Sequence, residues 1–310
     1  VALGAEPPAS FIYLPSLVAS VENYDAVCSI GENNCARLDP ELNLGKDDGF
    51  LGKLICAVLT SAPPGKEAVV GAFHVEPKAN VPTKLRHKVL MLLQRAKGIG
   101  SCSVSPYVVH LISQSLREHE QVQTAALQLA LVFADNVDPE SLTESSAAVL
   151  QEVEAVFWPG GGVVAMGPST PMAFRVYGAF TRKMAEHPGG AGRSLALNVA
   201  PRMLVLLAAN ERAAQDILEA LAGLVTCMRG ATESEWREFV PLLDKLVISP
   251  KAVVRREVLR WATALFPATS AEGRYYALRL FGDPDPDVAR AAENALSSGR
   301  REAPPFIGMC

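Results

Sequence analysis

Apolar residues return along this chain at the spacing of one face of an α-helix. From Leu85, the positions 4, 7, 8 and 11 residues further on are also apolar, the stripe that an amphipathic helix buries. The same offsets recur from Val122, Ile217, Val254 and Val288, and only the last position of the last stripe, Gly299, breaks the pattern. A further stripe consists of Ala173, Val176, Tyr177, Phe180 and Met184. The pattern predicts a chain that is nearly all helix.

These stripes are evenly spaced. Consecutive starts lie 37, 37 and 34 residues apart, except for the 95 residues between Val122 and Ile217. Such a period is typical of stacked helix pairs. An apolar helix precedes each stripe, for example "SPYVVHLISQSL" and "SEWREFVPLLDKLV", and no alternating strand pattern of useful length occurs.

Capping residues mark where several helices begin. Ser-Pro or Asp-Pro pairs at 105–106, 249–250 and 283–284 place a capping side chain before a proline at the first helical position. Three further pairs fit the capping box. They are Ser141 with Glu144, Thr232 with Glu235, and Thr269 with Glu272.

Energetics favour a stack over isolated helix pairs. One stripe buries about five apolar side chains at roughly 1.5–3 kcal/mol each, whereas ordering an 18-residue helix costs on the order of 25 kcal/mol. Each pair must therefore bury a second face on its neighbour, which gives an all-α fold, an α-solenoid of HEAT or armadillo type. We expect HEAT-like repeats at 49–158 and 171–300 and a Gly-rich connecting loop at 159–170. Residues 1–48 are unassigned, irregular or a partial repeat, and 301–310 form the tail of a truncated chain.

Composition narrows the function classes. Apolar residues make up 49% and aromatic residues 6%, which suits closely packed helices, and the net charge of −4 does not indicate a nucleic-acid or anionic-membrane partner. The longest apolar run, at 203–209, is too short to cross a bilayer. The chain begins with Val1 rather than Met, and we expect a soluble internal piece of a longer intracellular protein, with reduced thiols. These are Cys28, Cys35, Cys56, Cys102, Cys227 and Cys310.

The segment "GGGVVAMGPST" is a candidate phosphate-binding loop. From Gly162 it runs to Gly167, Pro168 and Ser169, close to the G-x-x-x-x-G-K-[ST] pattern. Such a loop needs a preceding strand and a lysine for the phosphates. Here the preceding segment is helical in pattern and Pro168 replaces the lysine, so a connecting loop is the better interpretation.

Other candidate side chains favour structural roles. The five histidines, which are His74, His87, His110, His119 and His187, share no spacing, and no catalytic base is apparent near Cys102. Cys28 and Cys35 are the closest thiols but have no metal-site pattern. We therefore predict no catalytic, cofactor or metal residues and no cofactor. The protein-binding residues are unknown at this stage.

Charges near the C-terminus fit helix ends and contacts between repeats. Asp283, Asp285 and Asp287 complement the positive end of a helix and lack the twelve-residue spread of a calcium loop. Arg255 and Arg290 follow the first stripe residue closely, where such repeats place a basic side chain that pairs with acidic groups of the next repeat.

At the level of motifs, the chain resembles a known family. The segments "SPKAVVRREVLRWATALFP", "YYALRLFGDPDPDVARAAENAL" and "PPFIGM", with "GAFHVEPKANVPTKLRHKVLMLLQRA" and "RVYGAFTRKM" before them, resemble HEAT-repeat proteasome adaptor and scaffold proteins of the type named extracellular mutant twenty-nine. The similarity covers about residues 50–300 and is strongest from 240 onward. The Gly-rich segment at 160–168 and "HPGGAG" at 187–192 are looser than a regular repeat.

The resemblance implies a scaffold without a catalytic site. Family members bind the proteasome, hold its core and regulatory particles together, and link it to transport and endosomal factors, in the cytoplasm and also in the nucleus. A HEAT-type nuclear transport receptor or other cargo carrier is the alternative, although such carriers tend to be markedly acidic. A nucleotide enzyme using the segment from Gly162 to Ser169 is the third reading.

Overall fold

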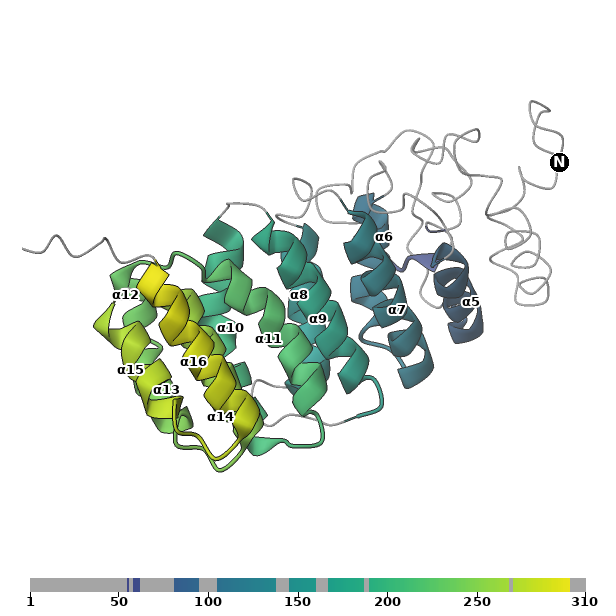
Figure 1. Cartoon of the computed structure of the whole chain (residues 1–310). Coiled ribbons are helices and arrows are strands. Elements are labelled where there is room, and N and C mark those ends of the chain that lie inside the picture. Colours follow the sequence, from purple (N-terminus) through teal and green to yellow (C-terminus); the bar gives the residue numbers. More distant parts are fainter. Residues whose placement is uncertain are drawn as a thin grey trace, which may run out of the picture. The chain divides into compact units, whose positions relative to one another are not determined.

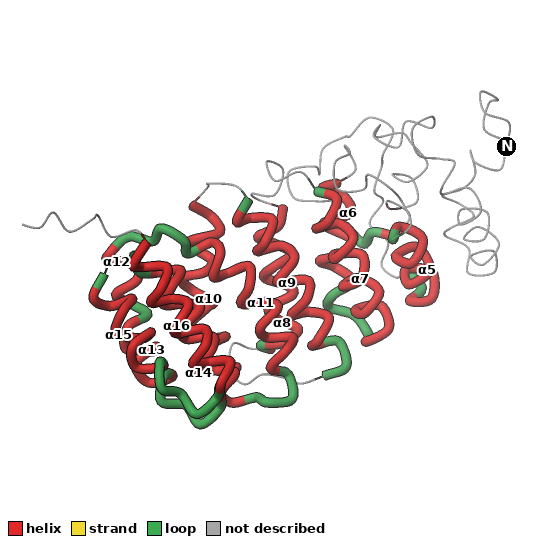
Figure 2. Tube along the Cα trace, in the orientation of Figure 1, coloured by secondary structure: helices red, strands yellow, loops and turns green. Residues whose placement is uncertain are grey.

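The computed structural model of the 310-residue chain describes residues 55, 58–61, 81–94, 105–137, 145–159, 167–186, 190–267 and 270–301. In these ranges the ordered elements are helices, and no strand occurs among them (Figure 2). The chain divides into two compact units, Val1–Lys183 and Met184–Cys310. Each unit is an α-solenoid segment, in which helices lie side by side in two layers (Figure 1).

The first unit contains five described helices. They are α5 (Thr83–Leu93), α6 (Ser105–Ser115), α7 (Glu120–Asn136), α8 (Ser145–Phe157) and α9 (Thr170–Ala185). α7 packs on α5 and α6, and α6 packs on α8. Aromatic contacts attach α9, because Phe174 stacks on Phe157 with ring centroids 4.7 Å apart and Phe180 lies 6.4 Å from Phe133.

The second unit contains seven helices in the described part of the chain. They are α10 (Gly190–Ala209), α11 (Ala214–Cys227), α12 (Glu233–Arg237), α13 (Val240–Leu246), α14 (Ala252–Leu265), α15 (Ala271–Leu280) and α16 (Pro286–Arg301). α12 and α13 are separated by only two residues and follow one another as one broken helix. Because short connections between packed helices make successive helices antiparallel, α10, α12–α13 and α15 run in one direction and α11, α14 and α16 in the other. We call the first set the A layer and the second the B layer.

The apolar stripes form the interior of both units. All described stripe residues that start from Leu85, Val122, Ile217 and Val254 are buried, with exposed fractions of 2% or less except Val225 at 3%. The stripe from Val288 is weaker, because Ala292 is buried while Ala295 and Leu296 are half-buried. The predicted all-α fold and its helical register are therefore confirmed.

The structure corrects the expected start of two helices. α14 begins at Ala252, so Pro250 precedes the helix, and Ser249 only accepts a hydrogen bond from the Lys251 N–H. α16 begins at Pro286 rather than Pro284. Its cap is Asp285, whose Oδ1 accepts from the N–H groups of Asp287 (3.0 Å) and Val288 (3.1 Å).

The remaining caps give a mixed outcome. The capping box of Thr232 with Glu235 is present. α15 is capped by Ser270, which accepts from the Gly273 N–H at 3.0 Å, one residue later than expected. α6 begins at Ser105 itself, whereas Ser141 and Glu144 lie outside the described residues.

Two helical segments differ from the expectation of regular pairs. The segment "SEWREFVPLLDKLV" forms two short helices, because Pro241 has no N–H to bond the preceding turn. There the Phe239 N–H bonds the Trp236 carbonyl, three residues back. Two glycines of "HPGGAG", Gly190 and Gly192, belong to the first turn of α10 and so differ from the expected loose segment, whereas 187–189 lie outside the described residues.

Candidate functional site

The candidate phosphate loop does not have the surroundings of a nucleotide site. The element before it is helix α8, not a strand, and residues 160–166 lie outside the described residues. Ser169 is only 4% exposed, and its Oγ lies 3.1 Å from the Thr124 Oγ1 of α7. The Thr170 Oγ1 accepts from the Gly167 N–H at 3.0 Å. The Ser169 hydroxyl therefore joins the start of α9 to α7, and the Thr170 hydroxyl caps the local turn.

The described histidines lie apart from one another. His110 is half-buried, and its ring nitrogen lies 3.1 Å from Ser61 Oγ and 2.9 Å from Gln114 Nε2. Burial lowers the pKa of His110, so the ring is held neutral in a structural network. His119 is exposed before the first turn of α7, while His74 and His187 lie outside the described residues.

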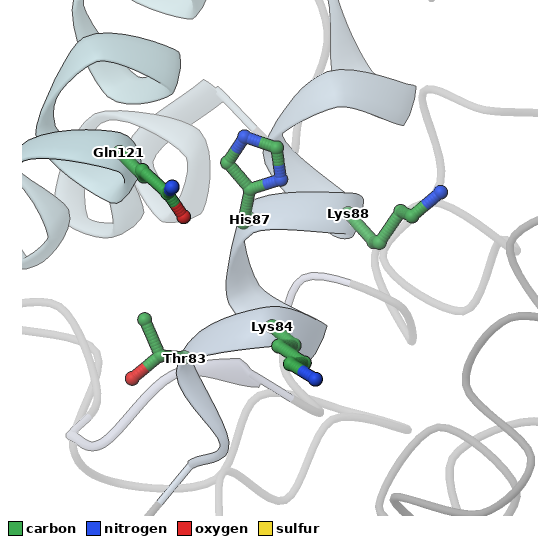
Figure 3. A pocket seen from close by; sticks show the side chains of 5 residues that line it. All are labelled: Thr83, Lys84, His87, Lys88 and Gln121. Atoms are coloured by element: carbon green, nitrogen blue, oxygen red, sulfur yellow. The ribbon is translucent and has the colours of Figure 1, made fainter.

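His87 lines a small hollow between α5 and α7. The hollow has a volume of about 120 Å³ and is also lined by Thr83, Lys84, Lys88 and Gln121. Figure 3 shows His87 and Gln121 on opposite sides of it and the Lys88 side chain extending away. Pockets for drug-sized ligands measure about 300–1,000 Å³. This hollow is therefore too small to enclose a nucleotide.

Thiols and metal ligands give no reactive centre in the described part. Cys227 carries a thiol rather than a disulfide, and burial raises its pKa to about 11, which makes it a poor nucleophile at neutral pH. The other five cysteines lie outside the described residues. Among the residues that can be placed, no three His, Cys, Asp or Glu side chains gather as a metal site. Nor is any described helix long and apolar enough to cross a bilayer.

The basic residues singled out from the sequence have different partners. Arg255 pairs with Asp283 of the next helix pair, through Nε to Oδ2 and Nη2 to Oδ1, both at 2.7 Å. Arg290 lies in α16, the last described helix, and pairs with Asp287 of the same helix at 3.2 Å, where both side chains are exposed. The predicted contact between repeats is therefore confirmed for Arg255, and for Arg290 it stays a prediction.

The Arg255 pair is enclosed and joins two connecting segments. The side chains of Arg255 and Asp283 are 11% and 3% exposed, and Arg255 Nη1 also donates to the Ser249 carbonyl at 2.7 Å. Asp283 Oδ1 accepts a further bond from the Asp285 N–H at 2.9 Å. The hydrogen bonds from Arg255 hold the pKa of Asp283 below its usual range. This network fixes the segment after α13 against the segment after α15.

The pairs Arg86–Glu118 and Arg117–Glu152 likewise join neighbouring elements of the first unit.

The structure also shows surface residues that sequence reasoning did not identify. Five large apolar side chains are exposed among the described residues, namely Val205, Ile248, Tyr275, Leu278 and Phe281. A signal existed in α15, where apolar residues fall on both faces: Tyr276 and Leu280 point inward, while Leu278 lies on the opposite face. Polar residues would be expected there on an ordinary amphipathic helix.

Taken together, these features define a helical repeat protein in which the described side chains pack the helices into layers and bond neighbouring helix pairs to each other. A family model described as "Proteasome component ECM29, N-terminal" matches residues 7–279. The chain therefore belongs to the ECM29 proteasome component family. The match includes residues 7–48 of the segment left unassigned above and ends before "PPFIGM".

A comparison with solved structures bears on the fold alone. The chain is similar to the crystal structure of an engineered protein from the Northeast Structural Genomics Consortium, with a TM-score of 0.52 and 14% identity, over 94% of this chain and 74% of that one. No curated protein matches the chain in sequence.

Proposed function

We propose that this chain is a non-enzymatic scaffold or adaptor that binds the proteasome. It would help to hold the core and regulatory particles together, or tether them to other factors such as transport or endosomal proteins. The observation that carries the proposal is the family match over residues 7–279, a family described as a proteasome component. The site of action would be the cytoplasm and also the nucleus.

The architecture supports a binding role. A solenoid presents a long surface on which contacts can be dispersed over several helices. Ion pairs such as Arg255–Asp283 fix neighbouring helix pairs against each other. A surface held in this way loses less conformational entropy on binding than a mobile one.

A pull-down with purified particles tests the proposal. The immobilised 310-residue chain should retain purified 26S proteasome, and adding the chain to a mixture of separated core and regulatory particles should increase the assembled fraction on native gels. Asp285→Asn should bind like the wild type, because Asn is an equally good helix cap. Val258→Asp, which places a carboxylate at a fully buried position, should not bind.

Three further measurements distinguish the alternatives and locate the contact. Recovery of a transport GTPase from a cell extract, without proteasome subunits, would overturn the proposal in favour of a cargo carrier. Calorimetry showing micromolar ATP or GTP binding that Ser169→Ala abolishes would support the nucleotide enzyme instead. Cross-linking mass spectrometry on the retained complex would identify the subunit that is contacted.

A further inference from the structure

The exposed apolar side chains of the second unit lie on one layer. Val205 is in α10, Ile248 follows α13, and Tyr275, Leu278 and Phe281 are in or directly after α15, so all five belong to the A layer. Their exposed fractions range from 44% for Tyr275 to 66% for Ile248. In the described part of the B layer, no large apolar side chain is exposed to this degree.

Four of these side chains, all except Tyr275, also lie at the same end of their helices. Val205 is in the last turn and a half of α10, and Ile248 and Phe281 come directly after the last turns of α13 and α15. Two bonds set the register between the helices. Lys251 Nζ donates to the Ala208 carbonyl of α10 at 2.8 Å, and the Tyr276 hydroxyl donates to Asp244 Oδ1 of α13 at 3.0 Å.

That register makes the residues a row. Tyr276 in α15 lies level with Asp244 in α13. Moving four residues along α13 and five along the parallel α15 therefore brings Ile248 and Phe281 to about the same level. The Lys251 bond places the segment after Ile248 beside the end of α10. With helix axes about 8–10 Å apart, the row crosses three helices over about 20 Å. We call Val205, Ile248, Leu278 and Phe281 the apolar row.

Cationic side chains flank the apolar row. Lys245 and Arg279 occupy the last turns of α13 and α15, and both are exposed. Arg279 lies over the Tyr275 ring, 5.9 Å from its centroid, and donates to the Tyr275 hydroxyl at 2.9 Å. Aromatic and arginine side chains are the residue types enriched in protein interfaces. The combination suits a partner that carries both apolar anchors and acidic groups.

We infer that the apolar row, with Lys245 and Arg279, is a docking surface for an acidic amphipathic segment of a protein partner. Apolar side chains of that segment would cover Ile248, Leu278 and Phe281, and its carboxylates would face the two cations. A partner segment of about 20 Å corresponds to an α-helix of roughly 13 residues. The inference rests on the proposed function only for the choice of the proteasome as probe.

A surface triple variant tests the assignment. Ile248→Ser, Leu278→Ser and Phe281→Ser together should weaken binding of purified 26S proteasome at least tenfold, because truncating central interface anchors has effects of this size. These side chains are already exposed, so the variant should keep its helical circular dichroism and melting temperature. The matched control changes exposed B-layer residues: Arg256→Ser, Glu293→Ser and Asn294→Ser should leave affinity within twofold.

A charge-reversal variant tests the chemistry of the partner. Lys245→Glu with Arg279→Glu should weaken binding more at 50 mM than at 300 mM salt, since salt screens exposed charges. Equal or stronger binding by this variant would overturn the acidic partner. Equal binding by the serine variant would overturn the docking surface while the proposed function stands.

Two further outcomes complete the test. If the wild-type chain does not retain the proteasome at all, the proposed function fails. The surface is then tested by sedimentation of the chain alone: a concentration-dependent dimer that the serine triple variant abolishes would show that a second copy covers the row, and would overturn the inference. A wild-type chain that stays monomeric and retains the proteasome through these residues would support it.

Discussion

Removing one partner of the Arg255–Asp283 pair should destabilise the second unit strongly. Asp283→Asn keeps the shape of the side chain and one acceptor oxygen, but leaves a guanidinium that is only 11% exposed without its hydrogen-bonded opposite charge. Breaking a buried ion pair from one side costs about 3–5 kcal/mol. Because the amide still accepts one bond, we expect a loss of about 3 kcal/mol. Arg255→Ala also gives up the bond to the Ser249 carbonyl, and should cost about 4 kcal/mol.

Urea unfolding followed by tryptophan fluorescence can measure this loss in the second unit alone. The chain has three tryptophans, and a Trp158→Phe background leaves only Trp236 and Trp261, both in the second unit. A double-mutant cycle with Arg255→Ala and Asp283→Ala should give a coupling energy of about 2 kcal/mol. As a control, Arg290→Ala breaks an exposed pair within one helix and should cost about 0.3 kcal/mol.

Acid should remove the contribution of this pair. The folded-state pKa of Asp283 is lower than in the unfolded chain, so the carboxylate stabilises the fold above the unfolded pKa of about 4 and this stability is lost as the pH falls through the folded pKa. The difference between wild type and Asp283→Asn should therefore be constant from pH 5 to 8 and shrink below about pH 4. Single substitutions that each cost under 1 kcal/mol, or a coupling energy near zero, would refute the reasoning.

Three other predictions concern stability. Glu257 is 4% exposed and burial raises its pKa, so the charged carboxylate lowers the stability of the fold above that pKa. Glu257→Gln should therefore raise the free energy of unfolding at pH 7 by about 1 kcal/mol in the same urea assay. It should also remove the gain in stability that the wild type shows on mild acidification. Gly192→Ala should lower the thermal midpoint at a cost of about 1 kcal/mol, because its Cβ would lie 3.0 Å from Cys227 Sγ, and a Cys227→Ala background should abolish that loss. Val258→Asp should unfold its repeat at a cost of several kcal/mol, whereas Asp285→Asn should leave the stability almost unchanged. Circular dichroism melts in which Asp285→Asn is the less stable variant would contradict the stripe assignment.

Helical periodicity predicted the interior well because burial depends on a regular spacing. Once Val254 faces inward, residues 4, 7, 8 and 11 further on face the same way, and all of them are buried. The break at Pro241 was also visible in principle, since a proline inside a helical pattern removes one backbone bond.

The start of α16 could not be chosen from the sequence. Asp283-Pro284 and Asp285-Pro286 fit the capping pattern equally well. The structure selects the second because Asp283 is bonded to Arg255, a residue 28 positions earlier. A contact at that separation depends on how the helix pairs stack, which local propensity does not determine.

Surface residues escaped prediction for a different reason. Leu278 and Phe281 are additional apolar residues in and directly after α15 that do not interrupt its buried face, so the sequence pattern does not indicate that they are exposed. Their shared position became visible only when the register between α13 and α15 was known. Binding surfaces formed by several helices cannot be seen in any single segment.

The ion pair and the apolar row are connected through the same two segments. Arg255 bonds the carbonyl of Ser249, the residue after Ile248, and the carboxylate of Asp283, two residues after Phe281. Arg255 therefore sets the separation between the Ile248 and Phe281 side chains, although Arg255 itself is not exposed. Replacing a buried ion pair by apolar residues is often neutral or stabilising, so net stability alone does not account for a charged pair at this position. Its bidentate geometry fixes distance and orientation together, and a docking surface spread over separate helices depends on both.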